Sequence, residues 1–284
     1  MRGFLRVTFV KIKIKKYQFK EYSFTKIMIS SFFIDVLKKQ PSLVHGTSPR
    51  CYVINGERKP LFCSGKDDGK LFLEHQISFL HSLGTGKKVF FRVTQVHGNH
   101  VYVLKDSGIP VGEVGSCEAD AIITHIPDCP IVVLTADCVP IIIYDPIKHV
   151  VGVVHAGRLG TQKRILTNTV EALSYEYDSN PKDLIVGMGP AIRGCCYELD
   201  EPSALPFIKK SSLCSEFINK TGENKFFLDL PKVNRFEGYE AGVLMENIYT
   251  NGPCTSCENH RWYSYRREGK TGRLITLAML QSKE

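Results

Sequence analysis

IVVLTADCVPIIIYDPIKHVVGVVHAG, residues 131–157, consists of three apolar runs divided by turn residues. Their lengths and β-branched composition are typical of buried strands, and they span residues 131–136, 139–145 and 149–156. Asp145, Pro146 and Lys148 supply a turn between the second and third runs. We therefore expect these two runs to form a hairpin or adjacent strands.

The same reasoning extends outward in both directions. Short apolar runs predict further strands at 89–96, 100–105 and 184–188. Apolar residues at helical spacing predict helices at about 161–175 and 232–248. The chain has 284 residues, of which 43% are hydrophobic and 23% charged, so one large α/β or α+β domain with a sizeable core is expected.

The beginning of the chain differs from the rest. Residues 11–20 read KIKIKKYQFK, so part of the net charge of +8 belongs to this segment and does not indicate a nucleic-acid or membrane partner. Met28 offers an alternative start. We expect residues 1–27 to be an N-terminal extension that need not belong to the native protein, and residues 28–284 to form a single catalytic domain.

The 10 cysteines are expected to be reduced. MRGFLRVTFV, residues 1–10, is followed by lysines and lacks the features of a secretory signal, which predicts a cytoplasmic location. There, cysteines serve as buried apolar residues, metal ligands or nucleophiles more often than as disulfides. No apolar run reaches the roughly 18 residues needed to span a bilayer, and nothing in the sequence predicts an oligomeric state.

Three strand ends carry chemically active side chains. His97 lies in QVHG, Cys138 in TADCVP and His155 in VVHAG. Two imidazoles and one thiolate suit a zinc site whose fourth position stays open for water or substrate. Taken singly, each would more often be a structural histidine or an inert buried cysteine. Asp120 and Asp137 are candidate acceptors that fix the imidazole tautomers, or else ordinary strand-end aspartates.

Seven motifs together resemble one family: QVHG, EADA, TADCVP, VVHAG, GPAIRGCCYEL, PCT and SYRREGKTGR. Their order is similar to that in the laccase-domain family, also called YfiH-like, bacterial multicopper polyphenol oxidase or purine nucleoside phosphorylase. The resemblance runs from about His45 to Leu277. It implies an α+β fold of mixed β-sheets flanked by helices, similar to a cysteine hydrolase fold. It also implies phosphorolysis of adenosine, inosine and methylthioadenosine, with some adenosine deamination.

The resemblance also implies roles for individual residues. It places the metal ligands on His97, Cys138 and His155, with Cys138 and His155 catalytic and Zn²⁺, or alternatively Cu²⁺, as cofactor. The partners implied are purine nucleosides and phosphate, with no nucleic acid or membrane. Candidate phosphate or substrate contacts, at the HGTSPR and SYRR motifs, are Arg50, Arg266 and Arg267. One of the last two is expected to be structural.

Two departures from the family pattern bear on the substrate. The family reads HAGWRG after the last ligand, whereas this chain has Arg158 and Leu159 after HAG, so the tryptophan is replaced and the arginine absent or displaced. The Gly-Gly and Asn-Leu features that normally follow the first motif are not visible in residues 51–68. The metal site is therefore the firmer expectation.

Other functions fit the same residues. A cysteine hydrolase or amidase would use Cys138 as nucleophile, His155 as base and His97 as orienter. A copper-dependent polyphenol oxidase and a non-catalytic nucleotide-binding module are further alternatives. Cys254 and Cys257 imitate half of a cytidine deaminase signature, but no His-x-Glu precedes them, so a turn with one buried cysteine is favoured over a second zinc site.

Overall fold

The hairpin forms the middle of a six-stranded sheet. In this computed structural model, which describes residues 27–54, 57–61, 77–87, 90–106, 114–209 and 216–282, β10 (Val139–Asp145) and β11 (Val150–Ala156) pair antiparallel over their whole lengths. The sheet order is β16-β12-β10-β11-β8-β6. Its other strands are β6 (Val101–Leu104), β8 (Ala121–Thr124), β12 (Ile185–Met188) and β16 (Ile248–Tyr249). The predicted hairpin and the strands near 100–105 and 184–188 are confirmed.

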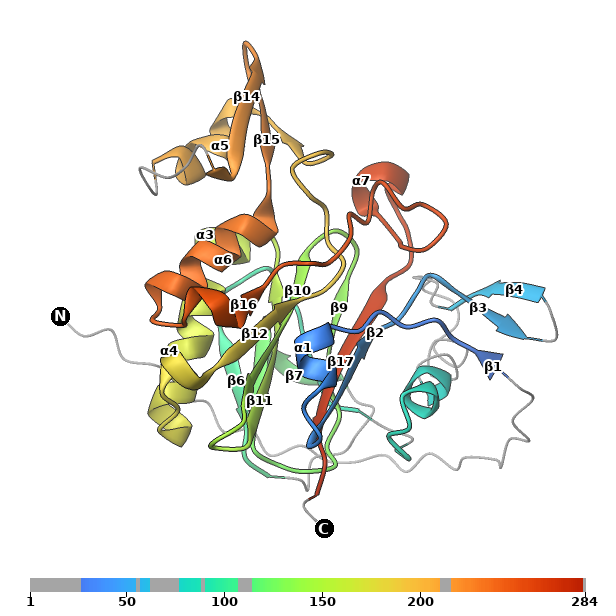
Figure 1. Cartoon of the computed structure of the whole chain (residues 1–284). Coiled ribbons are helices and arrows are strands. Elements are labelled where there is room, and N and C mark those ends of the chain that lie inside the picture. Colours follow the sequence, from blue (N-terminus) through green and yellow to red (C-terminus); the bar gives the residue numbers. More distant parts are fainter. Residues whose placement is uncertain are drawn as a thin grey trace.

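A second, antiparallel sheet covers one face of the first (Figure 1). Its order is β2-β17-β9, and its strands are β2 (Leu43–Thr47), β9 (Ile131–Thr135) and β17 (Leu274–Leu280). Successive side chains of a strand face opposite sides. On β10, Ile142 and Tyr144 face the second sheet, whereas Ile141 and Ile143 face the helices. Burial on both faces explains why these strands are continuously apolar in sequence.

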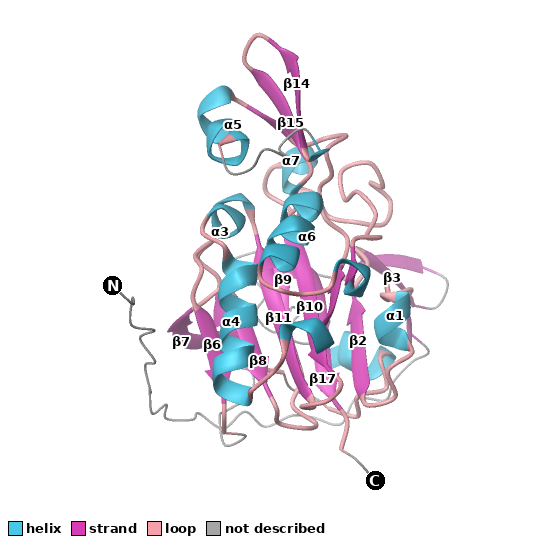
Figure 2. Cartoon of the chain, turned by 60° about the vertical axis from the view of Figure 1, so that its left-hand side comes forward, coloured by secondary structure: helices cyan, strands magenta, loops and turns pink. Residues whose placement is uncertain are grey.

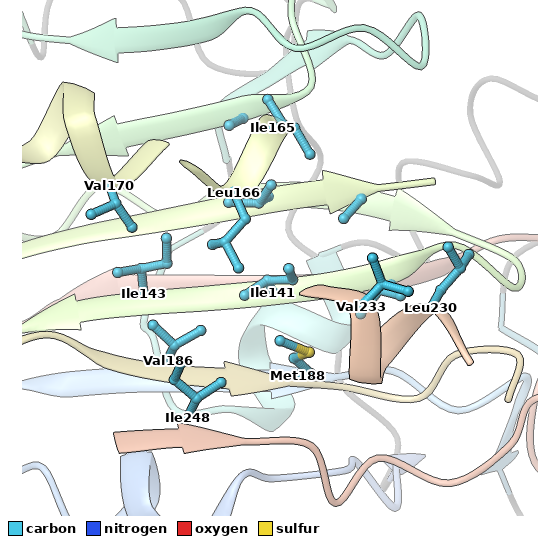
Figure 3. Packing of buried hydrophobic residues seen from close by; sticks show 14 of the residues in the cluster. Ile141, Ile143, Ile165, Leu166, Val170, Val186, Met188, Leu230, Val233 and Ile248 are labelled. Carbon is cyan, nitrogen blue, oxygen red and sulfur yellow. The ribbon is translucent and has the colours of Figure 1, made fainter. Parts of the chain in front are cut away.

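Helices cover the opposite face of the six-stranded sheet. Figure 2 shows α4 (Ile165–Tyr177) and α6 (Leu230–Glu240) on this side. Leu166 and Val170 of α4 and Val233 of α6 pack with the β10 residues Ile141 and Ile143 (Figure 3). This core connects the helices rigidly to the strands that carry the candidate ligands.

The boundaries of both predicted helices needed correction. The first is interrupted: α3 (Arg158–Gln162) ends before Arg164, whose φ of 64° is left-handed, and α4 begins at the next residue. The second ends near Gly242, whose φ is 94°. The chain beyond it forms a 3-10 turn and then β16, because Ile248 pairs with Val186 of β12.

Smaller elements surround these layers. The helices are α1 (Asp35–Lys38), α5 (Glu201–Ile208) and α7 (Tyr265–Glu268). The strands are β1 (Ile27–Met28), β3 (Cys51–Ile54), β4 (Glu57–Pro60), β5 (Arg92–Thr94), β7 (Val114–Glu118), β13 (Glu198–Leu199), β14 (Ile218–Gly222) and β15 (Lys225–Leu228). The group formed by α5, β14 and β15 projects beyond the main sheets (Figure 1).

Two further predictions concern the N-terminal extension and membrane-spanning segments. The predicted extension, residues 1–27, lies outside the described residues except for Ile27. Within the part of the chain that is described, no helix combines the length and the apolar character needed to cross a bilayer. The architecture itself is mixed α+β, as the resemblance implied.

A buried histidine in β2 gives the fold a pH dependence. His45 Nε2 accepts a hydrogen bond of 3.0 Å from Ile34 N, and burial lowers the pKa of His45 to about 4. The unfolded chain takes up this proton below about pH 6.5, whereas the folded chain resists it until about pH 4, so stability is lost as the pH falls between these values. We expect the unfolding free energy to drop by up to roughly 3 kcal/mol from this group.

The measurement is urea denaturation at pH 7 and pH 4.5 for the wild type and His45→Gln. Glutamine keeps an acceptor for Ile34 N but has no proton to gain, so the variant should lose less stability over this interval. An identical pH dependence in the two proteins would contradict the assignment.

Candidate metal centre and adjoining pocket

Three side chains that are distant in sequence meet at one end of the β10–β11 hairpin. Cys138 immediately precedes β10, and His155 lies near the end of β11, where it is the register partner of Pro140. His97 comes from the loop after β5. The donor atoms of all three lie within 4.8 Å of one another, and Cys138 Sγ is 3.8 Å from His97 Nε2. The three predicted ligands are therefore brought together.

The backbone around the cluster is strained in ways that place these groups. His97 and Asp137 have φ values of 56° and 86°, in the left-handed region that residues other than glycine rarely adopt. No room remains for a side chain at Gly157, because a Cβ there would lie 2.9 Å from both Cys138 Sγ and His97 Cδ2. The close approach of the backbone to the two ligands therefore requires glycine at this position.

Asp120 organises the two histidines. It is fully buried, and its Oδ1 lies 2.7 Å from His155 Nδ1 and accepts a 3.0 Å hydrogen bond from His97 N. Its Oδ2 accepts hydrogen bonds from the N–H groups of Val96 and Gly98, at 3.3 and 2.5 Å. Burial raises the Asp120 pKa, but the bonds from His155 and these N–H groups outweigh it and hold the pKa below its usual value. The geometry agrees with the predicted orienting role of Asp120 toward the His155 ring.

Asp137 has a different environment from the one predicted. Its Oδ1 accepts from Thr255 Oγ1 and its Oδ2 from Arg266 N, both at 2.6 Å. No hydrogen bond joins it to an imidazole among the described residues. The prediction that Asp137 fixes a histidine tautomer is thus corrected: its carboxylate instead ties the turn beside Cys138 to two C-terminal segments.

The electrostatics of the cluster favour a thiolate. Burial raises the Cys138 pKa, but His155 and then His97 outweigh it and lower the pKa to about 6. Burial lowers the His155 pKa, but the Cys138 and Asp120 charges raise it to about 9. A negative sulfur between two imidazoles is the donor set that zinc prefers, and tetrahedral coordination would separate sulfur and nitrogen donors by about 3.6 Å. The observed 3.8 Å fits such an ion.

The cluster opens into a pocket of about 670 Å³, a volume within the range of small-molecule sites. Polar and aromatic side chains around the three ligands are Arg92, Gln95, Arg158, Tyr197, Tyr265, Arg266 and Arg273. Because four of these are arginines, the pocket is suited to an anionic ligand. The tyrosines add aromatic surface on the same wall.

The three arginines named from sequence divide between pocket and scaffold. Arg266 lines the pocket, stacks over Tyr197 at 4.9 Å and donates to Glu198 O. Arg267 does not line it: its guanidinium donates to the carbonyl oxygens of Thr255, Ser256 and Trp262. Arg267 is the structural member of the pair.

Arg50 is also part of the scaffold rather than of the pocket lining. Its Nη1 donates to Asn259 O at 2.6 Å and to Glu268 Oε1 at 2.8 Å, and its guanidinium lies over the Tyr263 ring. These contacts join the residue before β3 to the C-terminal segment. The predicted contact of Arg50 with phosphate or ribose is therefore not supported by its position.

The sequence analysis did not predict that Arg158 lines the pocket. The departure from HAGWRG suggested a lost or displaced arginine, yet Arg158 at the first position of α3 lines the pocket, while Leu159 is 41% exposed. An arginine directly after a ligand-bearing strand was the available signal. Arg92 had no such signal, because it reaches the pocket from within strand β5. Arg273, in the loop before β17, ends the SYRREGKTGR motif but was not singled out.

Comparisons with known proteins identify the family of the chain. The profile of a family described as "Multi-copper polyphenol oxidoreductase laccase" matches residues 61–281. A Bacillus subtilis protein, "Purine nucleoside phosphorylase YlmD", is 34% identical over 188 residues, which cover 64% of this chain and 67% of that protein. A "Purine nucleoside phosphorylase" of Xylella fastidiosa (strain Temecula1) is 31% identical over 221 residues, covering 77% and 83% of the two chains.

Longer relatives and a solved structure complete the comparison. The chain spans 48% and 55% of the length of its mouse and human relatives. The crystal structure of the Bacillus licheniformis hypothetical protein YfiH superposes with a TM-score of 0.77 at 26% identity and covers 86% of this chain and 95% of that one. The chain therefore belongs to this laccase-like, YfiH-type family.

Proposed function

We propose that the protein is a metal-dependent purine nucleoside phosphorylase that accepts adenosine, inosine and methylthioadenosine, with adenosine deamination as a side activity. The single observation that carries the proposal is the opening of the His97–Cys138–His155 cluster into a pocket walled by arginines. The names of two relatives supply the reaction class. Zinc is the proposed ion and copper the alternative.

The residues that line the pocket suit both substrates, phosphate and the purine nucleoside. Arg158, Arg92 and Arg273 provide positive charge for phosphate, while Tyr197 and Tyr265 offer aromatic surface to the purine. Bound by the three ligands, zinc would supply Lewis acidity. In the reaction, a phosphate oxygen bonds to ribose C1′, the C1′–N9 electron pair leaves with the purine, and the proton of hydrogen phosphate ends on the base. Electrostatic positioning by the arginines lowers the cost of bringing two reactants together.

The test is an assay of purified protein with each nucleoside, with and without inorganic phosphate, combined with metal analysis. Phosphate-dependent release of the base together with ribose 1-phosphate, or 5-methylthioribose 1-phosphate from methylthioadenosine, supports the proposal. Base release without phosphate indicates hydrolysis, and inosine formed from adenosine indicates deamination. Stoichiometric metal with no turnover of any nucleoside would overturn the proposal in favour of a binding role.

Arg158→Ala should weaken phosphate use specifically. Removing one charge-assisted contact costs about 1.5–3 kcal/mol, so KM for phosphate should rise roughly 10- to 100-fold. Lys163→Ala is the control, because Lys163 is an exposed cation just after the same short helix and does not line the pocket. Equal KM values for phosphate in wild type and Arg158→Ala would remove Arg158 from the phosphate site.

One observation favours a second candidate, a cysteine hydrolase. Cys138, His155 and Asp120 are arranged as nucleophile, base and orienter, with Asp120 in the orienting place that His97 was expected to hold. Irreversible alkylation of Cys138 that abolishes amide or ester hydrolysis in metal-free protein would support this candidate. Stoichiometric metal in the active protein would argue against it.

A further inference from the structure

Four cysteines gather at a place separate from the candidate metal centre. Cys195 and Cys196 lie in a turn after β12, and Cys254 and Cys257 lie in a turn before α7. Cys257 Sγ is 3.5 Å from Cys195 Sγ and 3.4 Å from Cys196 Sγ, and all four sulfurs lie within 4.8 Å of one another. The sequence showed only half of this group, the Cys-x-x-Cys at 254–257.

The backbone holds the two turns together independently of the sulfurs. Ala191 and Cys254 form a parallel bridge, with hydrogen bonds from Ala191 N to Pro253 O at 3.2 Å and from Thr255 N to Ala191 O at 3.1 Å. The four side chains therefore converge from two segments whose relative position is already fixed. This is the arrangement of a built site rather than of mobile side chains that meet by chance.

The spacing of the sulfurs fits a metal ion. A tetrahedral ion with bonds of about 2.3 Å to sulfur separates its ligands by about 3.8 Å. The observed 3.4 and 3.5 Å contacts are near this value. They are far longer than a disulfide bond of about 2.04 Å. Without a bound cation or a disulfide bond, bringing four thiols this close together would add little to the stability of the fold.

Backbone amides prepare Cys254 for a negative charge. N–H groups of Cys257, Arg193 and Ser256 donate hydrogen bonds to the Cys254 sulfur, an environment that suits a thiolate ligand.

We propose that Cys195, Cys196, Cys254 and Cys257 bind one Zn²⁺ ion in a closed, four-thiolate structural site. With four protein ligands no position remains for water or substrate, unlike the three-ligand cluster at the pocket. Cys195 and Cys257 are exposed, so the ion can enter from solvent.

The position of the four-cysteine site gives it a role in shaping the pocket. One turn continues into Tyr197, which lines the pocket. In the other, Thr255 donates to Asp137 beside Cys138, and its carbonyl accepts from Arg267. An ion bound by both turns would hold in place the side of the pocket that Tyr197 and Asp137 line.

The decisive measurement is zinc analysis and X-ray absorption of a His97→Ala/Cys138→Ala variant, purified anaerobically, which lacks the first centre's ligands. We expect one zinc per chain surrounded by four sulfurs at about 2.3 Å. The wild type should hold two zinc ions, and Cys254→Ser/Cys257→Ser one. A Cys51→Ser/Cys129→Ser variant removes two cysteines outside both clusters and should retain two.

The outcomes are distinct. No zinc in the His97→Ala/Cys138→Ala variant, coordination by nitrogen or oxygen, or a disulfide within the cluster of the anaerobic protein would each overturn the four-thiolate site. The absorption spectrum is recorded on a protein that retains all four cysteines of the proposed site, so a misfolded Cys254→Ser/Cys257→Ser protein does not affect it. None of these readouts involves a nucleoside, so failure of the proposed phosphorylase activity is recognised separately.

Discussion

Replacing Cys138 with alanine is expected to release the metal of the first centre and to lower kcat/KM for phosphorolysis by roughly a thousandfold or more. The sulfur is the one anionic donor among three ligands, and it lies 3.8 Å from His97 Nε2. Loss of metal-ion catalysis removes several kcal/mol of transition-state stabilisation, and about 4 kcal/mol corresponds to a thousandfold. Metal analysis and steady-state kinetics on the same preparation measure the two effects together.

Cys129→Ala is the matched control for this experiment. Cys129 is a partly buried free cysteine outside both clusters, and its loss should leave metal content and turnover near wild type. A Cys138→Ala protein that lacks the metal but phosphorolyses nucleosides normally would rule out a catalytic role for this centre.

Asp120→Asn should weaken metal binding by about 10- to 100-fold, the usual cost of removing a carboxylate that orients a ligating histidine. The asparagine amide also faces N–H groups of residues 96–98, so at least one buried donor loses its acceptor, at about 1–3 kcal/mol of stability. Competition with a chelator measures the metal affinity, and chemical denaturation of the metal-free protein measures the stability.

Asp145→Asn separates the two effects. Asp145 is equally buried and accepts hydrogen bonds from Ile147 and Lys148 N at the opposite end of the same hairpin. Both bonds go to its Oδ1, which the asparagine oxygen can replace, so this variant removes a buried carboxylate and should keep the metal affinity of the wild type. If Asp120→Asn and Asp145→Asn bind metal equally well, Asp120 acts only on folding.

Local patterns explain why the centre of the fold was predictable. Strands β10 and β11 are short, continuously apolar and divided by a turn, so their pairing follows from nearby residues alone. The break at Arg164 was not predictable, because no glycine or proline marks it. The second helix was predicted too long because residues near Ile248 satisfy helical spacing, yet they pair with β12 in the folded chain. Tertiary contacts override local preference there.

The site divides in the same way. His97, Cys138 and His155 each stand in a recognisable motif at a strand end, so they could be proposed without knowing the fold. Arg50 pairs with Glu268, 218 residues later in the chain, a contact that no local pattern reveals. The four-cysteine group likewise joins segments about 60 residues apart, as the 3.4 Å contact of Cys196 with Cys257 illustrates.

The hydrogen bonds of Asp120 order the two candidate histidine ligands of the first centre before any ion binds. One carboxylate fixes the loop that carries His97 and the ring of His155 through contacts that involve no metal. The conformational entropy of these ligands is therefore lost when the chain folds and not when an ion binds. This preorganisation strengthens metal binding. A metal ion bound there could then be exchanged without rearrangement of the ligands, and its identity would follow ion supply as well as donor chemistry.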